Sequence, residues 1–329
     1  MSTSAFNKKT VLVTGGMGFI GSNLAIKLVN LGADVTIVDS MIPEYGGNMF
    51  NIFPISNNVN INYCDVTDKN AMEYVVREKD YIFHLAGQVS HVKSITDPYP
   101  DIEYNIKGTA ILLEACRKNN QEVVIMHTGT RGQYGSAIKL PVNEEAPTNP
   151  KGIYELSKLT QEKMFKIYYE NYGLNSVLTR LTNIYGPRAQ MKSNKYGVIN
   201  WFVRQAIDRE TISLFGDGSI KRDVVYVDDC VDALIKLIED KKAYGQIYNI
   251  GDDNPLTFKE IVQKIIKVNG YGKYKFTPFS DERKKQEPGD FYSDITKIKK
   301  EINWKPTTKF EVGIKKTISY YKKNKKYYW

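Results

Sequence analysis

The N-terminal segment combines a short apolar run, a glycine-rich turn and a helical pattern, in that order. Residues 10–14 (TVLVT) have the composition of a buried strand, residues 15–21 read GGMGFIG, and apolar residues from 23 to 29 recur with helical spacing. Glycines in such a turn let the backbone approach a pyrophosphate at the positive N-terminus of the helix. The segment therefore predicts a dinucleotide-binding unit, with cofactor contacts from Gly15, Gly18, Phe19, Ile20 and Gly21.

A second apolar run, residues 35–38, ends at Asp39. At this distance from the glycine turn, a carboxylate accepts hydrogen bonds from the hydroxyls of the adenosine ribose. The same negative charge would repel a ribose 2′-phosphate, and no arginine follows Asp39 closely. The pattern therefore favours NAD over NADP.

Tyr154 and Lys158 stand four residues apart at the start of a predicted helix, so their side chains leave the same helix face. A phenol with a pKa of about 10 is a poor base at neutral pH, but a neighbouring ammonium group lowers that pKa. The spacing alone also fits an ordinary exposed pair on an amphipathic helix. Its occurrence downstream of a dinucleotide-binding unit favours a catalytic pair.

The remaining sequence alternates between predicted strands and helices. Strands are expected at 11–14, 35–38, 60–63, 81–84, 123–127, 176–180 and 246–250, and helices near 18–30, 68–77, 103–118, 154–171, 197–208, 228–240, 257–268 and 309–323. This alternation predicts an α/β fold, a doubly wound parallel Rossmann sheet with ligands at its carboxyl edge and a smaller C-terminal substrate-binding lobe. We expect the NAD-binding domain to span 1–180 and to be rejoined by about 223–250. The lobe would span 181–329, mainly 181–222 and 251–329.

Composition places the chain among ordinary globular proteins. Its 329 residues are 42% hydrophobic and 25% charged, and they suffice for one large or two intermeshed domains. No 18-residue apolar span and no signal-peptide core is visible, so we expect a soluble cytoplasmic protein without a membrane partner. The three cysteines and three histidines lack metal-ligand spacing, so neither a metal site nor a disulfide framework is expected.

The net charge of +9 raises the question of nucleic-acid binding. Basic residues are densest at 315–329, where they alternate with aromatic residues that can stack on single-stranded nucleic acid. A terminal amphipathic helix with a solvated lysine face explains the same residues. We favour the helix, with part of the charge steering an anionic substrate and no nucleic-acid partner.

Eight segments together resemble the extended short-chain dehydrogenase/reductases that act on nucleotide sugars. They are GGMGFIG at 15–21, CDV at 64–66, HLAG at 84–87, NIKGT at 105–109, YELSK at 154–158, RLTNIYGPR at 180–188, FGDG at 215–218 and RDVVYVDD at 222–229. The resemblance runs from residue 11 to about 306. It implies an enzyme that binds NAD and a nucleotide-diphosphate sugar, and a homodimer formed through the helices at 103–118 and 154–171.

The resemblance also extends the predicted cofactor site. It implies contacts from Asp65, Val66, Leu85, Ala86, Gly87, Asn105 and Thr128, in addition to Tyr154 and Lys158. Asp65 would flank the adenine; capping the next helix is its alternative role, for which Thr67 and Asp68 compete. Asn105 would brace the active site, with an ordinary interior polar residue as the alternative.

Within this resemblance, the catalytic residues are Thr130, Tyr154 and Lys158. Counting back from the Tyr-Gly pair at 134–135 places Thr130 where the family has its catalytic Ser or Thr, and Thr128 is the competing assignment. Thr130 would bond the sugar oxygen and exchange a proton with Tyr154. Lys158 would hold the nicotinamide ribose and lower the pKa of Tyr154.

The two residues after Thr130 separate the reactions of the family. The 4,6-dehydratases carry Asp-Glu there and the uronate decarboxylases keep the Glu, whereas this chain has Arg131 and Gly132 and thus no carboxylate beside Thr130. Because eliminating water needs an acid and a base beside the hexose, both reactions are disfavoured. The remaining chemistry is reversible hydride transfer, which predicts an NAD-dependent epimerase acting on C4 of an NDP-hexose of the UDP-glucose/galactose type. The alternatives are a C2 epimerase, a uronate 4-epimerase, a 4,6-dehydratase, a ketoreductase or dehydrogenase with net redox, and a non-catalytic NAD-binding protein.

The substrate contacts implied by the resemblance lie mostly in the C-terminal lobe. They are Ser90, Thr130, Asn183, Arg188, Val198, Asn200, Leu214, Phe215, Arg222 and Asp290. Arg222 would clamp a phosphate, with an exposed ion pair to Asp223 or Asp228 as its alternative role. Arg188 would suit a uronate carboxylate, so the identity of the sugar stays open.

One position departs from the family pattern. Glu287 stands before Pro-Gly, where the family has an arginine. A carboxylate cannot hold a phosphate, so one of the nearby basic residues Arg283, Lys284 and Lys285 would have to replace that arginine.

Overall fold

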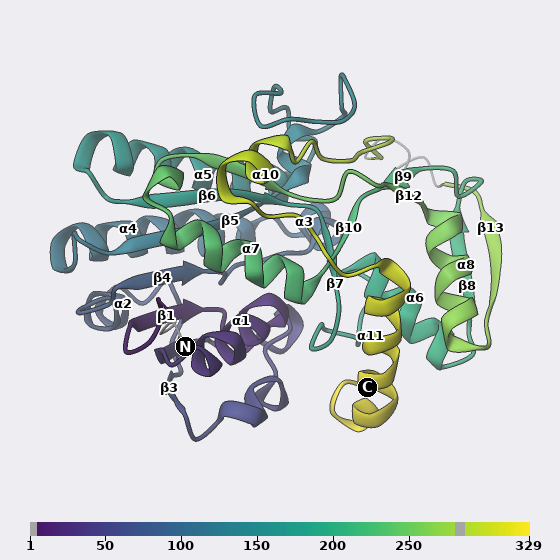
Figure 1. Cartoon of the computed structure of the whole chain (residues 1–329), viewed down its shortest axis with the longest axis horizontal. Helices are drawn as coiled ribbons and strands as arrows, with labels where there is room; N and C mark the ends of the chain where they lie inside the picture. The colour runs from purple at the N-terminus through teal and green to yellow at the C-terminus, as the bar shows by residue number, and fades with distance from the viewer. Residues whose placement is uncertain (1–4, 280–286) are drawn as a thin grey trace.

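The computed structural model describes residues 5–279 and 287–329. Its centre is a seven-stranded sheet with the strand order β11-β6-β5-β4-β1-β2-β3 (Figure 1). The strands are β1 (Thr10–Thr14), β2 (Asp34–Val38), β3 (Val59–Asn62), β4 (Tyr81–His84), β5 (Val124–Thr130), β6 (Ser176–Leu181) and β11 (Ile247–Ile250). All neighbouring strands are parallel, so their carboxyl ends share one edge. The predicted doubly wound α/β fold is confirmed.

Helices cover both faces of this sheet. One face carries α1 (Phe19–Asn30) and α7 (Val227–Glu239), and the other carries α2 (Lys69–Val75), α4 (Gly108–Asn119) and α5 (Ile153–Tyr172). Alternation along β1 explains the two layers, because successive strand residues point to opposite faces. Val11 and Val13 join the first core, whereas Leu12 joins the second.

Short elements follow the carboxyl ends of the strands. They are the 3-10 turns η1 (Pro43–Tyr45), η2 (Met49–Ile55) and η4 (Arg131–Tyr134), the helix α3 (His91–Thr96) and the π-helical turn η3 (Asp101–Lys107). None of the turns has the periodic apolar pattern of a helix, and the sequence did not predict them as separate elements. The predicted helix at 103–118 is a π-helical turn that continues into α4.

The remaining elements gather beside the sheet, with α6, α8, β8 and β13 at the right of Figure 1. They are β7 (Asn183–Tyr185), α6 (Val198–Ile207), β8 (Thr211–Phe215), β9 (Lys221–Arg222), β10 (Val224–Tyr226), η5 (Lys241–Ala243), β12 (Leu256–Thr257), α8 (Phe258–Asn269), β13 (Lys273–Thr277), α10 (Thr296–Ile302), α11 (Phe310–Asn324) and η6 (Lys325–Tyr327). The chain returns from these elements to the sheet through α7 and β11. The division into domains at residue 180 stays a prediction.

The basic C-terminus forms an amphipathic helix. Ile314, Ile318 and Tyr321 of α11 are buried in the core, whereas Lys315 and Lys322 are exposed. Within residues 5–279 and 287–329, no helix is long and apolar enough to span a membrane. In the same part of the chain, no group of His, Cys, Asp and Glu side chains is arranged to hold a metal ion.

Candidate active site

The turn between β1 and α1 requires glycine at two positions. Gly15 has a φ of +69°, and a Cβ there would lie 2.8 Å from the backbone nitrogen of Ala86, just beyond β4. A Cβ at Gly21 would lie 2.9 Å from the carbonyl carbon of Gly15. Gly15 also donates its N–H to the carbonyl oxygen of Val38 at the end of β2, at 2.7 Å. The glycines therefore let the ends of β1, β2 and β4 meet without side chains between them.

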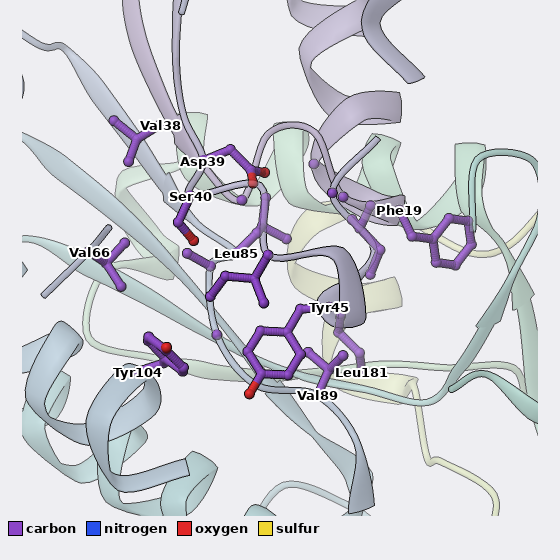
Figure 2. Close-up of a pocket in the computed structure, with 18 of the residues that line it drawn as sticks. Phe19, Val38, Asp39, Ser40, Tyr45, Val66, Leu85, Val89, Tyr104 and Leu181 are labelled. Carbon is purple, nitrogen blue, oxygen red and sulfur yellow. The ribbon is translucent and has the colours of Figure 1, made fainter. Parts of the chain in front are cut away.

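A cavity of about 290 Å³ opens at this edge of the sheet (Figure 2). Its wall includes most of the residues that the sequence assigned to the cofactor and one further catalytic candidate. These are Gly15, Gly18, Phe19, Ile20, Gly21, Asp39, Asp65, Val66, Leu85, Ala86, Gly87, Thr130 and Tyr154. Asn105, Thr128 and Lys158 are buried and do not line the cavity.

Tyr45 and Tyr104 also line the cavity, and the sequence did not predict them. Their rings meet edge to face, with centroids 5.7 Å apart, and both lie beside the cavity in Figure 2. They belong to η1 and η3, whose irregular turns show no pattern in the sequence. The only feature of the sequence that could have indicated a role for Tyr104 at the cavity is its position next to Asn105.

Asp39 is held in the cavity wall by backbone donors. Its two carboxylate oxygens accept hydrogen bonds from the N–H groups of Met17 and Met41, each at 2.9 Å. Burial raises the pKa of Asp39, and these two hydrogen bonds oppose the rise because they stabilise the carboxylate. The carboxylate thus has a fixed orientation at the end of β2.

Asp65 does not cap a helix. Its Oδ1 accepts hydrogen bonds from the backbone N–H and the hydroxyl of Thr67 at 2.9 and 2.8 Å. The N-cap of α2 is Asp68, which accepts from the N–H of Ala71 at 3.0 Å. Asp65 is thereby left at the end of β3, in the cavity wall with Val66.

Asn105 braces two segments of the site. Its side chain accepts from the N–H of Gln88 at 2.9 Å and donates to the carbonyl oxygen of Gln88 at 3.1 Å and to Ser157 Oγ at 2.9 Å. The loop after β4 is therefore tied to the start of α5. A side chain at Gly87 would collide with Asn105, so this loop and the asparagine fit closely.

Thr130 and Tyr154 meet in the cavity wall, where their side chains share a hydrogen bond. Thr130 also accepts from the N–H of Gly132 at 3.2 Å, which caps η4. Thr128 instead donates to the carbonyl oxygen of His84 at 3.2 Å, inside the sheet. Of the two threonines, Thr130 is therefore the one that lies beside Tyr154.

The pKa of Tyr154 is shifted in the direction opposite to the prediction. Burial raises the pKa of Tyr154, the Glu155 carboxylate raises it further, and the hydrogen bond with Thr130 opposes the rise. Burial also lowers the pKa of Lys158 to about 7. Lys158 is not among the main groups that shift the pKa of Tyr154. In the chain alone the pKa of Tyr154 is thus raised, not lowered as predicted, because the low-polarity wall penalises charge on both groups.

The depressed pKa of Lys158 predicts a pH-dependent cost to stability. With a pKa of about 7 in the folded chain and 10.5 as the reference, the unfolded chain binds more protons between those pH values, so stability rises with pH across that window. Lys158→Met removes the cost. We expect the ligand-free variant to melt at a higher temperature than the parent protein below pH 7, with the difference vanishing as the pH approaches 10.5.

Thermal unfolding at a series of pH values checks this expectation. The matched control is Lys166→Met, which removes a lysine from an exposed ion pair with Glu170 on the same helix. It should show almost no change at any pH. A Lys158→Met protein that melts lower than the parent by a constant amount at every pH would contradict the assignment.

A carboxylate does lie beside Gly132, contrary to the expectation from the sequence. A Cβ on Gly132 would be 2.5 Å from Cγ and 3.3 Å from Oε1 of Glu155. Glu155 follows Tyr154 on α5 and is 8% exposed. Its Oε1 lies 2.5 Å from Nδ1 of His91 on α3. The sequence could not reveal this neighbour, because residues 132 and 155 belong to different elements.

Arg131 occupies the other position after Thr130. Its guanidinium lies over the ring of Phe291 at 5.2 Å, and no hydrogen bond to it is found in the described part of the chain. Burial lowers its pKa to about 10, with the positive charge of Arg222 as the next largest cause. At neutral pH the side chain is still a cation.

Arg222, which is buried, forms an ion pair with Glu287, whose side chain is 25% exposed. Arg222 Nη2 lies 2.6 Å from Glu287 Oε1, and its Nη1 donates to the carbonyl oxygens of Gly289 and Lys221 at 2.6 and 2.8 Å. The Arg222 side chain is only 3% exposed. The alternative pairing of Arg222 with Asp223 or Asp228 is therefore wrong. Glu287, which stands where the family has an arginine, neutralises the charge of Arg222, the residue predicted to clamp a phosphate. Arg283, Lys284 and Lys285 lie outside the described residues.

Arg188 and Ser90 make contacts within the protein. Arg188 donates to the carbonyl oxygen of Asn51 at 3.1 Å and to Asn23 Oδ1 at 2.9 Å, and it stacks on Tyr320. The two hydrogen bonds use Nε and Nη1 of the guanidinium. Ser90 is buried, caps α3 and donates its hydroxyl to the carbonyl oxygen of Lys195 at 3.0 Å.

The other predicted substrate contacts do not line the cavity. Asn183 donates to the carbonyl oxygen of Asp223, and Asp290 accepts from the N–H of Lys221. Leu214 is buried, while Val198 and Phe215 are more accessible. Asn200 accepts from the N–H of Gly186 at 3.1 Å, and its buried Nδ2 has no partner among the described residues. The site residues on the lobe stay predictions.

The chain is similar to known proteins along most of its length. Residues 12–317 match the family model described as GDP-mannose 4,6 dehydratase. The chain is 32% identical to a putative UDP-glucose 4-epimerase of Methanocaldococcus jannaschii (95% of this chain, 99% of the relative) and 33% identical to a UDP-N-acetyl-alpha-D-glucosaminuronate decarboxylase of Bacillus cytotoxicus (96% and 98%). A solved structure of the dTDP-glucose 4,6-dehydratase from Streptomyces venezuelae with bound NAD superimposes with a TM-score of 0.87 at 27% identity (97% and 98%).

Proposed function

Because this chain belongs to the extended short-chain dehydrogenase/reductase family of nucleotide-sugar epimerases and dehydratases, we propose that it is an NAD-dependent epimerase that inverts C4 of an NDP-hexose through a transient keto-sugar. Its relatives include epimerases, decarboxylases and dehydratases, so the choice among reactions rests on this chain's own residues. The observation that carries the choice is the hydrogen-bonded pair of Thr130 and Tyr154, followed by Arg131 in place of an acid.

The cavity fits a dinucleotide. Glycine at 15 and 21 lets the turn pack against the backbone that follows β4 and against the first turn of α1. The same glycines line the cavity at the N-terminus of α1, where a pyrophosphate would bind. Asp39 is oriented to accept from a ribose, and Asp65 and Val66 line the same cavity. NAD held by these residues would supply a hydride acceptor and donor.

The protein groups would handle the proton of the reacting hydroxyl. Tyr154 takes that proton and later returns it, while Thr130 holds the same oxygen. Burial penalises the phenolate and the ammonium separately. Lys158 leaves the same face of α5 as Tyr154, so its ammonium would be the positive charge that accompanies the phenolate. No other proton has to leave the site, which suits a reaction that begins and ends at the same carbon.

Dehydration lacks one of its two required groups. Expelling a hydroxyl as water needs an acid beside it, and Arg131, with a pKa of about 10, holds its proton at neutral pH. Glu155 lies beside the second position, Gly132. The site thus has a carboxylate near position 132 but no acid at position 131. Because elimination needs both groups, this arrangement supports epimerisation better than elimination.

A specific observation favours uronate 4-epimerase as the second candidate. Arg131 is a partly buried cation without a hydrogen bond in residues 5–279 and 287–329, and buried guanidinium groups in proteins are normally paired. A carboxylate on the sugar would supply the missing partner.

A panel of UDP-glucose, UDP-N-acetylglucosamine, UDP-glucuronate and dTDP-glucose tests the proposal by NMR of the products. We expect one of these sugars to be converted to its C4 epimer without loss of mass. A preference for UDP-glucuronate that disappears in Arg131→Gln would favour the uronate candidate. A keto-deoxy or decarboxylated product from every sugar that is turned over would refute both.

Asp39 predicts cofactor selectivity. Its fixed carboxylate would face the 2′-phosphate of NADP, and two like charges a few ångströms apart cost about 1–4 kcal/mol, which corresponds to roughly fivefold to a thousandfold in affinity. We expect titration to give tighter binding of NAD than of NADP. Asp39→Asn should reduce the ratio of the two affinities. Equal affinity of the parent protein for both cofactors would argue against this role.

We also infer a homodimer formed through the outer faces of α4 and α5. Ile153, Leu156 and Ile167 of α5 are each more than 40% exposed, an apolar surface that association would cover. Light scattering should give twice the mass of the chain. A Leu156→Glu variant should shift the protein toward the monomer, and a parent protein that is monomeric at micromolar concentration would exclude the dimer.

A further inference from the structure

The carboxyl group of Glu155 occupies the space where a side chain at position 132 would project. A Cβ on Gly132 would lie 2.5 Å from Cγ, 3.4 Å from Cδ and 3.3 Å from Oε1 of Glu155. A glutamate at 132 would carry its own carboxyl group two bonds beyond that Cβ. Glu155 therefore brings a carboxylate from α5 into the space that η4 leaves empty, next to Thr130 and Tyr154.

Packing alone does not account for this side chain. Glu155 is buried, and its Oε2 has no hydrogen-bond partner among the described residues. A buried carboxylate oxygen without a partner is costly, and such groups in folded proteins call for a functional explanation. Gly152 lies against Oε2 without a side chain, so the backbone on this side leaves room for the carboxylate as well.

The other oxygen is connected toward solvent. Oε1 lies 2.5 Å from His91 Nδ1, and the His91 side chain is 36% exposed. An imidazole that reaches the surface can exchange protons with water. Glu155 and His91 thus form a dyad with one end beside the catalytic pair and the other end at the surface.

We propose that Glu155, backed by His91, is a second acid–base group that removes and returns the proton on the sugar carbon adjacent to the transient ketone. The C–H bond breaks, its proton passes to Glu155, and its electron pair forms the double bond of an enolate whose charge rests on the keto oxygen. Thr130 and Tyr154 donate hydrogen bonds to that oxygen. Return of a proton from Glu155 to the same face of the carbon restores the keto-sugar. Because Glu155 exchanges its proton with water through His91, this hydrogen of the sugar exchanges with water while the keto-sugar is bound.

This inference rests on the proposed function, because the ketone arises by hydride transfer. The test is turnover of the four panel sugars in D₂O, followed by NMR at the carbons flanking C4. We expect deuterium to accumulate at one flanking carbon of both epimers. Glu155→Gln keeps the size and the hydrogen-bonding capacity toward His91, so it should lower the rate of deuterium entry by about 10² or more while epimerisation stays within about tenfold.

The matched control is Glu170→Gln, an exposed carboxylate on the same helix, which should change neither rate. His91→Gln should slow deuterium entry without abolishing epimerisation. Epimer formed in D₂O without deuterium beside C4, or with undiminished deuterium in Glu155→Gln, would overturn the inference and leave the proposed function standing. If no panel sugar is turned over at all, both fail together.

Discussion

Tyr154→Phe is expected to lower turnover by about 10² to 10⁴, the range typical for loss of a general acid–base group. The phenol shares a hydrogen bond with Thr130 in the cavity wall, so it lies where the proton of the reacting hydroxyl would be taken up, whereas Glu155 is assigned to the proton on the neighbouring carbon. The ring remains, so the affinity for NAD should be almost unchanged. Steady-state kinetics with the best panel sugar, together with cofactor titration, measure the two quantities separately.

Tyr168→Phe provides the matched control. It removes a hydroxyl near the C-terminal end of the same helix, where Tyr168 donates to Glu114 at 2.8 Å and does not line the cavity. Turnover should stay close to that of the parent protein. If Tyr154→Phe retained normal turnover, another residue would have to be the base.

Arg180→Met is expected to destabilise the fold by about 3–5 kcal/mol, because it leaves a buried carboxylate without its cation. Arg180 of β6 donates to both oxygens of Glu162 on α5 at 2.7 Å, and the Glu162 side chain is 1% exposed. Glu162 also accepts from Gln133 of η4 at 2.8 Å. The pair therefore joins the sheet, α5 and the turn that carries Arg131, and urea unfolding should show a large fall in the midpoint.

An exposed pair of the same geometry serves as the control. Arg117 donates to both oxygens of Glu114 at 2.8 Å, with the Arg117 side chain 35% exposed. Arg117→Met should cost no more than about 1 kcal/mol. Equal losses in the two variants would mean that burial does not determine the cost of breaking the pair.

Local patterns in the sequence predicted the cofactor side of the site. The glycines at 15–21 and the acid at Asp39 act within one strand–turn–helix–strand unit, so their spacing along the chain fixes their positions in space. The four-residue spacing of Tyr154 and Lys158 likewise placed both residues on α5. The central strands and the long helices followed from apolar periodicity, which is strong wherever an element packs against the sheet.

Contacts between distant segments were not predictable in the same way. The pairing of Arg222 with Glu287 and the position of Glu155 against Gly132 each depend on how separate elements pack, which no local pattern encodes. Burial also reversed one electrostatic expectation. The sequence indicated an ammonium that lowers the pKa of Tyr154, but it could not show that the wall shields both groups from water and so raises that pKa.

The most direct test of the central claim follows the hydrogen on the reacting carbon. A panel sugar that is turned over is prepared with deuterium at C4, and its product is examined by NMR and mass spectrometry in ordinary water. The account predicts a C4 epimer that keeps the deuterium at C4, with no lasting accumulation of NADH, because the hydride leaves and returns at the same carbon. A product lighter by one water or by its carboxyl group, or NADH formed in proportion to product, would contradict it.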